Sequence, residues 1–297
     1  MRILVTGATG FIGSAFARLA LSCGHRVAGL AIPGEALPEH WPAAGNLSWI
    51  RGTLEHAPWE EIRAFEPETC VHTAWITTPG VYLESPHNLW FRDVSVEFLC
   101  KTSELGVGHV VSLGTCIEYQ INRAPLSEEK TAVAPTTTYA RCKNELRVRL
   151  EQAAKDQGFA LCWCRVFYPY GPGEHPSRLC GAIIRKLSAN QPLLLKTPQS
   201  TKDYIYIDDL AAAVLTVVEK RFHGTINIGT GTGVSVKDIA GCLAELMGKR
   251  ELIQEQNSPE ADPLPYVVAD VSRLRGLGWR PAYDLRQGLK RLIETVR

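Results

Sequence analysis

Two residues in the segment TTYARCKNE have the types and the spacing for acid–base chemistry. Tyr139 and Lys143 stand four residues apart, so a helix would place both side chains on one face. A neighbouring ammonium stabilises tyrosinate and lowers a phenol pKa that starts at about 10. Tyr139 would then donate a proton near neutral pH. An ordinary pair on a helix surface has the same spacing, so this interpretation needs support from the rest of the chain.

A glycine-rich segment near the start of the chain has the pattern of a dinucleotide-binding loop. In VTGATGFIGSAFARLA, three glycines lie between a short apolar strand and an amphipathic helix. Glycines permit a tight turn and let backbone N–H groups approach a pyrophosphate at the positive end of the helix. A turn without a ligand is the alternative, and the strand-before, helix-after context disfavours it. The predicted cofactor contacts in this loop are Gly7, Thr9, Gly10, Phe11, Ile12 and Gly13.

The end of the second strand indicates which dinucleotide binds. An Asp or Glu at this position holds the ribose 2′-OH of NAD, and a carboxylate there would repel the 2′-phosphate of NADP. Ala31 occupies the position here, and the sequence offers no obvious arginine for the phosphate. Glu35 is close enough in sequence to contact the ribose from another register. We therefore expect NADP(H) as the preferred cofactor, with NAD(H) as the alternative.

Strand-like and helix-like segments alternate through the N-terminal half and must position these residues. Apolar strands that are separated by helices form a parallel sheet covered on both faces. Thr115 follows the strand at 109–114, and ligands bind at the carboxyl ends of strands in such sheets. Thr115 is therefore a candidate third catalytic residue. The predicted strands are 2–6, 26–32, 47–51, 69–74, 109–114 and 159–166, and the predicted helices are 11–23, 59–65, 89–105 and 135–157.

The alternation loosens after Gly171, where Pro and Gly cluster at 169–176. The predicted fold class is α/β, with a Rossmann-type doubly wound parallel sheet and a smaller C-terminal α/β substrate domain. We place the dinucleotide-binding domain at 1–170, rejoined by 204–222, and the substrate domain mainly at 171–297. The elements expected after residue 171 are helices at 178–190 and 235–247, strands at 192–196 and 225–229, and a strand followed by a helix at 203–219.

Composition disfavours several classes of function. The chain has 297 residues and a formal net charge of +1, which offers no electrostatic footprint for nucleic acid or a membrane surface. No apolar stretch reaches the ~18 residues that a membrane span requires, and no signal peptide is visible. Nine scattered cysteines are typical of reduced core residues in a cytoplasmic protein.

Several reactive residue types are interpreted as structural. The pair in CWC at 162–164 lacks the spacing of a CxxC site, so we expect a buried strand there. His72 lies inside an apolar strand and is expected to be a core histidine, whereas His175 is expected in a loop at the solvent or the substrate rim. Asp208 and Asp209 are placed to cap a helix, so no metal site is predicted.

Eight segments in order resemble the extended short-chain dehydrogenase/reductases, also called the NAD-dependent epimerase/dehydratase family. The resemblance covers nearly the whole chain. It implies a Rossmann domain for the nicotinamide cofactor and a C-terminal domain for a nucleotide sugar. The segments are TGATGFIG (6–13), VHTA (71–74), SLGTCIEY (112–119), YARCK (139–143), RVFYPYGPGE (165–174), KDYIYIDD (202–209), INIGTGTGVSV (226–236) and LGWRP (277–281).

The resemblance also implies roles for individual residues. Tyr139 takes the position of the general acid/base, and Lys143 takes that of the residue that lowers its pKa and holds the nicotinamide ribose. Thr115 takes the family's Ser/Thr position, which hydrogen-bonds the reacting oxygen. Tyr168 is assigned to the cofactor and the substrate, and Arg178 to the phosphates of the sugar nucleotide, with a solvated helix arginine as the alternative. The residues expected on the adenosine and phosphate side of the cofactor are Thr53, Leu54 and Ala74.

Departures from the family's pattern discriminate among its reactions. Sugar-nucleotide 4,6-dehydratases carry Asp-Glu directly after the catalytic Thr, whereas Cys116 and Ile117 stand here, so dehydration is not expected. Epimerases of the family usually carry Asp where Ala31 stands, and Asn where Tyr168 stands. Three further positions concern phosphate contacts: Lys202 stands for the Arg of an RDF motif, and an R-x-G-D motif keeps Asp262 but has Pro259 in place of its Arg.

The expected function is NADPH-dependent reduction of the 4-keto group of a nucleoside-diphosphate 4-keto-6-deoxyhexose in deoxysugar biosynthesis. A nucleotide-sugar epimerase with tightly bound NAD is the alternative enzyme, and reduction of a small non-nucleotide ketone is a weaker one. A dinucleotide sensor without catalytic activity is the alternative from another class. Family members often pair through two helices, so we expect a homodimer through the helices at 89–105 and 135–157.

Overall fold

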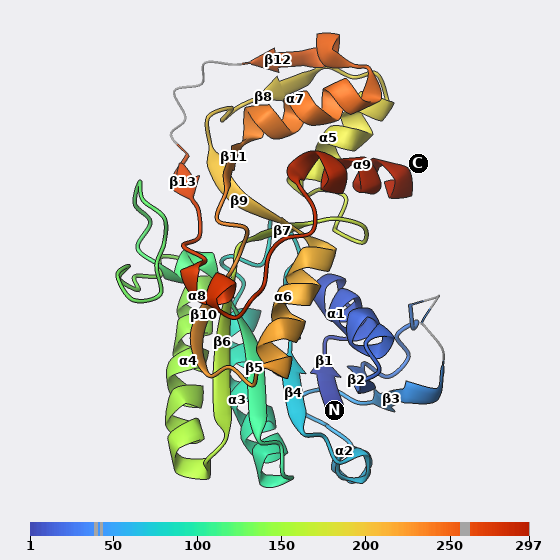
Figure 1. The fold of residues 1–297 in the computed structure, drawn as a ribbon, viewed down its shortest axis with the longest axis vertical. Helices are drawn as coiled ribbons and strands as arrows, with labels where there is room; N and C mark the ends of the chain where they lie inside the picture. The colour runs from blue at the N-terminus through green and yellow to red at the C-terminus, as the bar shows by residue number, and fades with distance from the viewer. Residues whose placement is uncertain (39–40, 42–43, 256–261, 297) are drawn as a thin grey trace.

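Seven parallel strands form the central sheet of the protein (Figure 1). The computed structural model describes residues 1–38, 41, 44–255 and 262–296. The strand order is β10-β6-β5-β4-β1-β2-β3, and every neighbouring pair is parallel. The strands are β1 (Arg2–Thr6), β2 (Arg26–Ala31), β3 (Leu47–Arg51), β4 (Thr69–His72), β5 (His109–Thr115), β6 (Ala160–Val166) and β10 (Gly224–Ile228).

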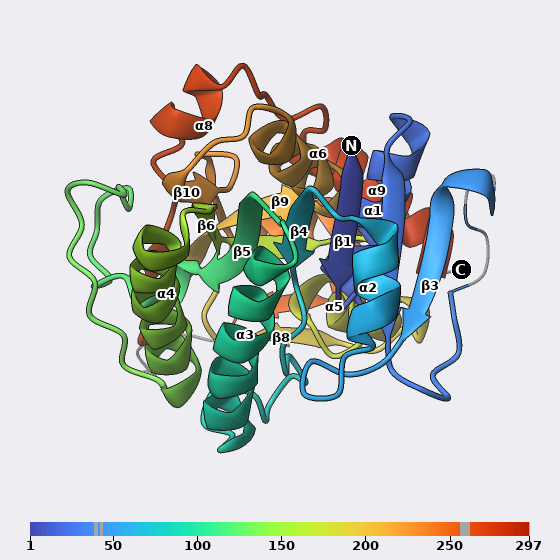
Figure 2. The ribbon, with the colours of Figure 1, turned by 90° about the horizontal axis from the view of Figure 1, so that it is seen from below.

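Helices cover both faces of this sheet, as the view in Figure 2 shows. On one face, Phe16 of α1 and Leu210 of α6 pack in the same core as Val5 of β1. On the other face, Phe98 of α3 and Leu146 of α4 share a second core with apolar side chains of the strands. The predicted fold class is therefore confirmed for the sheet and its covering helices. These helices are α1 (Phe11–Ser22), α2 (Trp59–Phe65), α3 (His87–Glu104), α4 (Thr138–Gln157) and α6 (Ile207–Glu219).

The strand order reverses at the centre of the sheet. β1 pairs with β2 on one side and with β4 on the other, so the connections that leave β1 and β4 run in opposite directions. A crevice forms outside the carboxyl ends of the strands at such a reversal, and it is the usual ligand site of open α/β sheets. The glycine-rich segment follows β1 directly, and Thr73 and Ala74 follow β4.

The C-terminal part of the chain forms a smaller layer above the carboxyl ends of the strands (Figure 1). Its main sheet has the order β11-β9-β13, with β7 paired to β9, and a separate pair joins β8 and β12. A third apolar core fills the space between these strands and three helices. The elements are β7 (Tyr168–Tyr170), β8 (Leu193–Leu195), β9 (Thr201–Tyr206), β11 (Gly233–Ser235), β12 (Ile253–Glu255), β13 (Tyr266–Val267), α5 (Leu179–Ser188), α7 (Val236–Met247) and α9 (Leu285–Val296). Helix α8 (Ser272–Gly276) follows β13 in the chain but packs beside β10 of the central sheet (Figure 1), and its Leu274 belongs to the core beneath α1 and α6.

Two sequence predictions about this architecture need correction. Helix α4 begins at Thr138 rather than at residue 135, because the Thr137 hydroxyl accepts a hydrogen bond from the backbone N of Ala140 at 3.2 Å and caps the helix. Strand β10 belongs to the central sheet, where Ile226 is in register with Cys164 of β6. The segment that returns to this sheet therefore extends beyond 204–222. The division of the chain at residue 170 stays a prediction.

The chain runs from the upper layer to the central sheet without a linker, and hydrogen bonds also join the two layers. Tyr206 ends β9 in the upper layer, and Ile207 begins α6 against the central sheet without a linker. The carboxylate of Asp209, in the first turn of α6, accepts hydrogen bonds from the backbone N of Ala282 at 2.7 Å and of Tyr283 at 3.2 Å. Asp209 was expected to cap its own helix, and instead it fixes the segment that leads into α9. The active-site crevice therefore has walls from two layers that are fastened together.

Candidate active site

A cavity of about 290 Å³ lies between the carboxyl ends of the central strands and the upper layer. Three predicted catalytic residues line it, namely Thr115, Tyr139 and Lys143. Tyr168 of β7 and Arg178, which precedes α5, line the same cavity from the upper layer. The structure thus brings together the predicted catalytic residues and the predicted substrate contacts, which come from four separate segments of the chain.

Tyr139 lies in the first turn of α4 and points into this cavity. Its ring meets the ring of Tyr82 edge-on at 4.9 Å and that of Trp75 at 6.4 Å. Burial raises the pKa of the phenol well above its ordinary value, and the neighbouring Thr115 side chain opposes the shift. The hydroxyl therefore keeps its proton at neutral pH, and it is a weaker acid than a free phenol, contrary to the lowered pKa that the sequence predicted.

Lys143 is 3% exposed and lies one helical turn beyond Tyr139. Its Nζ donates a hydrogen bond to the backbone O of Leu113 at 2.8 Å and lies 3.8 Å from the centroid of the Trp75 ring. Burial lowers the pKa of this ammonium to about 7, and the negative charge of Glu118 opposes the decrease. The family resemblance implied that Lys143 lowers the pKa of Tyr139. In this structure burial has the largest effect on the Tyr139 pKa, and the Lys143 ammonium contacts Leu113 and Trp75.

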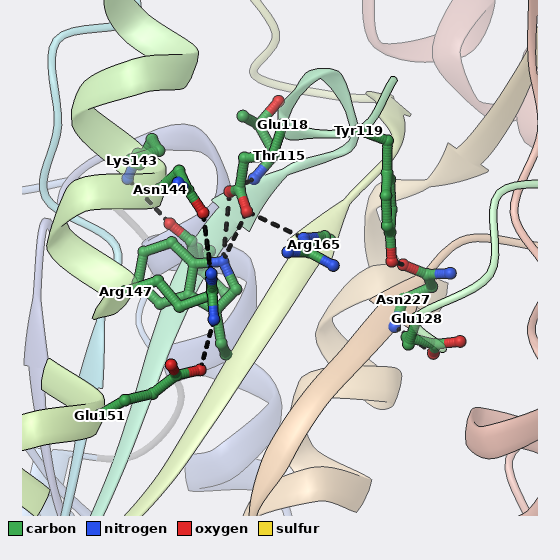
Figure 3. Close-up of polar contacts among 12 residues, drawn as sticks. Thr115, Glu118, Tyr119, Glu128, Lys143, Asn144, Arg147, Glu151, Arg165 and Asn227 are labelled. Carbon is green, nitrogen blue, oxygen red and sulfur yellow. Dashed lines mark hydrogen bonds and ion pairs between the residues drawn. The ribbon is translucent and has the colours of Figure 1, made fainter. Parts of the chain in front are cut away.

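Thr115 ends β5 and precedes a short 3-10 helix at Cys116–Glu118. Its backbone N donates to Glu118 Oε1 at 2.8 Å. Figure 3 shows that the Glu118 carboxylate also accepts from the side chains of Trp163 and Arg165, at 3.1 Å and 2.8 Å. Glu118 is 0% exposed and Arg165 is 2% exposed. A fully buried ion pair therefore supports the strand end that carries Thr115.

A second groove, of about 630 Å³, adjoins this cavity along the glycine-rich loop. Gly7 has φ +66°, which favours glycine, and its backbone lies against Thr73 and Ala74. A Cβ on Gly13 would overlap the backbone O of Gly7 and would lie 2.7 Å from Thr73 Oγ1. The loop and α1 are thus packed as closely as glycines allow. The predicted cofactor contacts that line the groove are Gly7, Thr9, Gly10, Phe11, Ile12, Gly13 and Ala74.

This groove fits a dinucleotide. Gly10 is the N-cap of α1, no side chain bonds to the cap, and the first turn carries no acidic residue. The free backbone N–H groups at the positive end of a helix are the ordinary partners of a pyrophosphate. The groove also shares Trp75, Thr77 and Arg178 with the catalytic cavity, so the two spaces are continuous.

The residues predicted at the end of β2 and on the adenosine side of the cofactor differ in whether they line this groove. Ala31 is buried at the end of β2, in register with Arg51 of β3, and its neighbour Ile32 lines the groove. Thr53 accepts a hydrogen bond from the backbone N of His56 at 2.9 Å. Leu54 is buried in the core beneath. Thr53 and Leu54 do not belong to the lining, so their predicted roles in binding remain predictions.

Two charged residues, Glu35 and Arg51, lie near the end of β2. Glu35 Oε1 accepts a hydrogen bond from Thr9 Oγ1 at 3.1 Å. Arg51 Nη1 donates to the backbone O of Ile32 at 3.1 Å and of Glu35 at 2.8 Å. The sequence offered no obvious cation at this place, because Arg51 ends the third strand rather than following the second. The side chains of Glu35 and Arg51 thus both lie near the end of β2.

The residues at the family's other phosphate positions are engaged with one another. Lys202 Nζ pairs with Asp262 at 3.0 Å, bonds to Ser200 Oγ at 2.8 Å and lies 5.8 Å from the centroid of the Tyr168 ring. Asp262 also accepts a hydrogen bond from Ser200. Pro259, the third position discussed above, lies outside the described residues. Lys202 and Asp262 therefore brace the wall behind Tyr168.

The other reactive residue types lie in structural settings. His72 is buried and bonds to Thr6 at 2.8 Å and to Ser95 at 3.0 Å, and burial lowers its pKa to about 3. His175 bonds to Ser177 Oγ at 2.8 Å at the edge of the cofactor groove. Cys162 and Cys164 are free thiols inside β6. Among the residues that the structure describes, no group of three or more His, Cys, Asp or Glu could hold a metal ion.

Comparison with known proteins decides the family. The model of the NAD dependent epimerase/dehydratase family matches residues 3–229 of this chain. The chain belongs to this family. The identification covers the whole central sheet up to the end of β10, and it agrees with the resemblance seen in the eight sequence segments.

Relatives within the family differ in their reactions. UDP-glucose 4-epimerase of Corynebacterium glutamicum is 26% identical over 96% of this chain and 93% of its own. A dTDP-4-dehydro-6-deoxyglucose reductase of Escherichia coli is 29% identical over 60% of this chain and 58% of its own. The crystal structure of Thermus thermophilus UDP-glucose 4-epimerase in complex with NAD has a TM-score of 0.84 at 25% identity, covering 100% of this chain and 99% of the other.

Three functional candidates emerge only from the structure. Trp75 directly follows Ala74 in the sequence, but nothing in the sequence places its ring on Lys143. Glu118 lies inside the SLGTCIEY segment, where an acid three residues after Thr115 was the available signal. Arg51 had no signal, because strand register decides that it meets the end of β2.

One further finding concerns passage through a membrane: the helices in the described part of the chain are all too short or too polar to span one.

Proposed function

We propose that this protein uses NADPH to reduce the 4-keto group of a nucleoside-diphosphate 4-keto-6-deoxyhexose. One observation carries the proposal: Tyr139 and Thr115 line one cavity, and this cavity continues into the glycine-loop groove. A proton donor and a dinucleotide groove in one continuous space suit carbonyl reduction. The sugar is expected between Thr115 and Tyr168, with its phosphates toward Arg178.

The chemistry divides between the cofactor and three side chains. The nicotinamide cofactor, when bound, supplies the hydride. Tyr139 donates its proton to the carbonyl oxygen, and a positioned acid of this kind contributes about 10²–10⁴ in rate. The Thr115 hydroxyl hydrogen-bonds the same oxygen and aligns it. The Lys143 ammonium places a positive charge near the reacting oxygen. This charge stabilises the tyrosinate that remains after Tyr139 has donated its proton.

Two features support reduction over the family's other reactions. Elimination of water needs an acid or base after the catalytic Thr, and Cys116 has its thiol pKa raised to about 12 by burial, while Ile117 is apolar. The relative named as a dTDP-4-dehydro-6-deoxyglucose reductase supports the substrate class. The relatives named as UDP-glucose 4-epimerases keep a nucleotide-sugar epimerase as the second candidate.

Loss of reduced-nicotinamide absorbance tests the proposal. Purified protein is mixed with NADPH or NADH and a panel of nucleoside-diphosphate 4-keto-6-deoxyhexoses. Oxidation of NADPH by one member of the panel, with stoichiometric formation of the 4-hydroxy product, is the expected result. Interconversion of a 4-hydroxy nucleotide sugar without net cofactor consumption would instead establish the epimerase. Neither reaction, despite tight dinucleotide binding, would favour the sensor.

We further propose that the cofactor preference for NADP(H) rests on Arg51. Its guanidinium lies beside Ile32 and Glu35, at the strand end where the 2′-position of the adenosine ribose is expected. Glu35 works in the opposite direction, because a carboxylate there accepts a ribose hydroxyl and repels a phosphate. The known structure of a relative with NAD makes NAD(H) the alternative.

Replacing Arg51 by Gln should weaken NADPH binding by about tenfold or more and leave NADH binding nearly unchanged, since a hydrogen bond to a charged group contributes about 1.5–3 kcal/mol. Dissociation constants for both cofactors, measured by quenching of tryptophan fluorescence, provide the test. Arg26→Gln is the matched control, because Arg26 is exposed at the opposite end of β2. An equal loss for both cofactors, or tighter NADH binding in the wild type, would contradict the assignment.

We also propose a homodimer through α3 and α4. These helices lie side by side and are linked by ion pairs from Arg92 to Glu145 at 2.5 Å and from Arg149 to Asp93 at 2.7 Å. Large apolar side chains on their outer surface are unusually accessible: Leu89, Trp90 and Val148 are 40–50% exposed. Exposed apolar groups of this size are common in protein–protein interfaces.

The variant Trp90→Glu should convert the dimer to a monomer, because it places a charge in the apolar surface that the two copies would bury. Light scattering coupled to size exclusion measures the mass directly. Leu194→Glu is the control, since Leu194 is similarly exposed on β8, far from α3 and α4. A wild-type protein that is already monomeric at micromolar concentration would end this proposal.

All nine cysteines are free thiols. Cys162 and Cys164 form no disulfide, although their sulfur atoms lie 3.7 Å apart. Free thiols in such number suit a reducing compartment. We therefore propose a cytoplasmic location, which cell fractionation with a tagged chain would test.

A further inference from the structure

The buried acid behind the catalytic cavity has no role in the chemistry proposed above. Glu118 is fully buried, yet it carries a carboxylate in a core made largely of apolar side chains. A buried ion pair is weak evidence for stability, because an apolar pair of similar size is often as stable. Its presence next to Thr115 therefore asks for a functional reason.

Three consecutive residues at the end of β5 connect Glu118 to the catalytic group. The backbone O of Leu113 accepts the hydrogen bond of Lys143 Nζ at 2.8 Å. Gly114 leaves the space that the carboxylate fills, because a Cβ there would lie 2.5 Å from Glu118 Oε1. The backbone N of Thr115 donates to the same oxygen at 2.8 Å. The acid thus fixes the short stretch of backbone that holds Lys143 on one side and presents Thr115 on the other.

The charges around Lys143 make Glu118 the relevant anion. Tyr139 on the same helix is neutral, because burial raises its pKa. His72 on β4 is also neutral, since its pKa is lowered to about 3. Arg165 on β6 is a cation, and in Figure 3 it lies on the far side of the Glu118 carboxylate from Lys143. Glu118 is therefore the negative charge that faces the buried ammonium, and it opposes the effect of burial.

We propose that Glu118 is a positioning residue of the active site, whose buried carboxylate anchors the backbone between Leu113 and Thr115 and supplies the counter-charge of the Lys143 ammonium. The role in catalysis rests on the proposed reductase function, but the effect on Lys143 does not. Arg165 and Trp163 hold the carboxylate in place through 2.8 Å and 3.1 Å hydrogen bonds. A purely structural acid would leave the protonation of Lys143 unchanged.

The titration of Lys143 is the experiment that tests this. Lysine labelled with ¹³C at the ε position gives one resonance per side chain, and the Lys143→Met variant identifies the resonance of Lys143. The wild-type midpoint is expected at about 7. A wild-type midpoint at about 5–6, the range of lysines buried without a counter-charge, would overturn the proposal.

Glu118→Gln keeps an oxygen for the Thr115 backbone and removes the charge, and it turns an amide NH2 toward Arg165 and Trp163 in place of an acceptor oxygen. The Lys143 midpoint should then fall by about one pH unit, the lower end of the effect of an opposite charge nearby. The descending alkaline limb of the kcat profile should move to lower pH by the same amount. Glu151→Gln is the matched control on α4, because Glu151 bonds to Arg147 two turns away and should leave the midpoint unchanged.

A second variant guards against misfolding. Glu118→Gln leaves the buried Arg165 without its anion, whereas Glu118→Gln combined with Arg165→Gln removes both charges. The downward shift of the Lys143 midpoint should persist in the double variant. An unchanged midpoint in either folded variant would reduce Glu118 to a structural residue. Because the titration needs no substrate, a protein that reduces none of the proposed sugars still gives a decisive result.

Discussion

Tyr139→Phe is expected to lower turnover by about 10²–10⁴, the contribution of a positioned general acid, while leaving cofactor binding nearly intact. The phenyl ring can keep its edge-on contacts with Tyr82 and Trp75, so the walls of the cavity should persist. What disappears is the hydroxyl that neighbours Thr115 and that burial keeps protonated at neutral pH. Steady-state kinetics with NADPH and the productive sugar, together with a dissociation constant for NADPH, make the measurement.

Tyr82→Phe provides the matched comparison for this result. Tyr82 lines the same cavity and contacts the ring of Tyr139 at 4.9 Å between centroids, but it belongs to the loop before α3 and has no assigned proton. Its loss should change turnover by less than about tenfold, since no charged or proton-transfer step depends on it. Equal losses in the two variants would mean that packing of the aromatic rings, rather than the Tyr139 proton, limits the reaction.

Gly13→Ala is expected to have the second large effect, on both stability and cofactor binding. The added Cβ would overlap the backbone O of Gly7 and lie 2.7 Å from Thr73 Oγ1, so α1 must move away from the turn that precedes it. Overpacking of this kind costs about 1–3 kcal/mol of unfolding free energy. The movement also displaces the N–H groups that are aimed at the pyrophosphate, so NADPH affinity should fall steeply.

Thermal unfolding and a cofactor titration measure the two consequences separately. Gly241→Ala is the control of opposite sign, because Gly241 lies within α7 and an added Cβ there meets nothing within 4 Å. Alanine in a helix is more stable than glycine by about 0.5–1 kcal/mol, so this variant should unfold at a higher temperature. If Gly13→Ala bound NADPH as the wild type does, the groove beside α1 would not be the cofactor site.

The central sheet was predictable from sequence because its signal is local. Each buried strand is a short apolar run, and the six strands predicted in the N-terminal half appear within one or two residues of their predicted ends. Thr69–His72 ends earlier than predicted, since the Thr73 hydroxyl donates to the backbone O of Thr6 at 2.8 Å and the chain turns away from the sheet. The glycine loop was equally visible, because its spacing has a direct steric cause.

The parts that escaped prediction depend on contacts between distant segments. The indole of Trp75 follows β4 and reaches Lys143 because α4 packs against β5, the neighbour of β4, and the indole Nε1 donates to Asn88 at 2.8 Å. Likewise, Glu118 meets Trp163 and Arg165 across 45 and 47 residues of chain. No periodicity or local spacing encodes such meetings. The predicted substrate and cofactor contacts therefore stay predictions. The structure places most of the residues concerned around one continuous space.

The position of β10 has a consequence for the order in which the protein can fold during synthesis. β6 forms one edge of the sheet until β10 pairs with it, residue Cys162 with Gly224 through Val166 with Ile228. A nascent chain that has reached only residue 170 exposes this edge, with unpaired N–H and C=O groups beside apolar side chains. Such an edge is a template for aggregation. Completion of the central sheet must therefore wait until the ribosome has released residue 228, well after Thr115, Tyr139 and Lys143 have emerged.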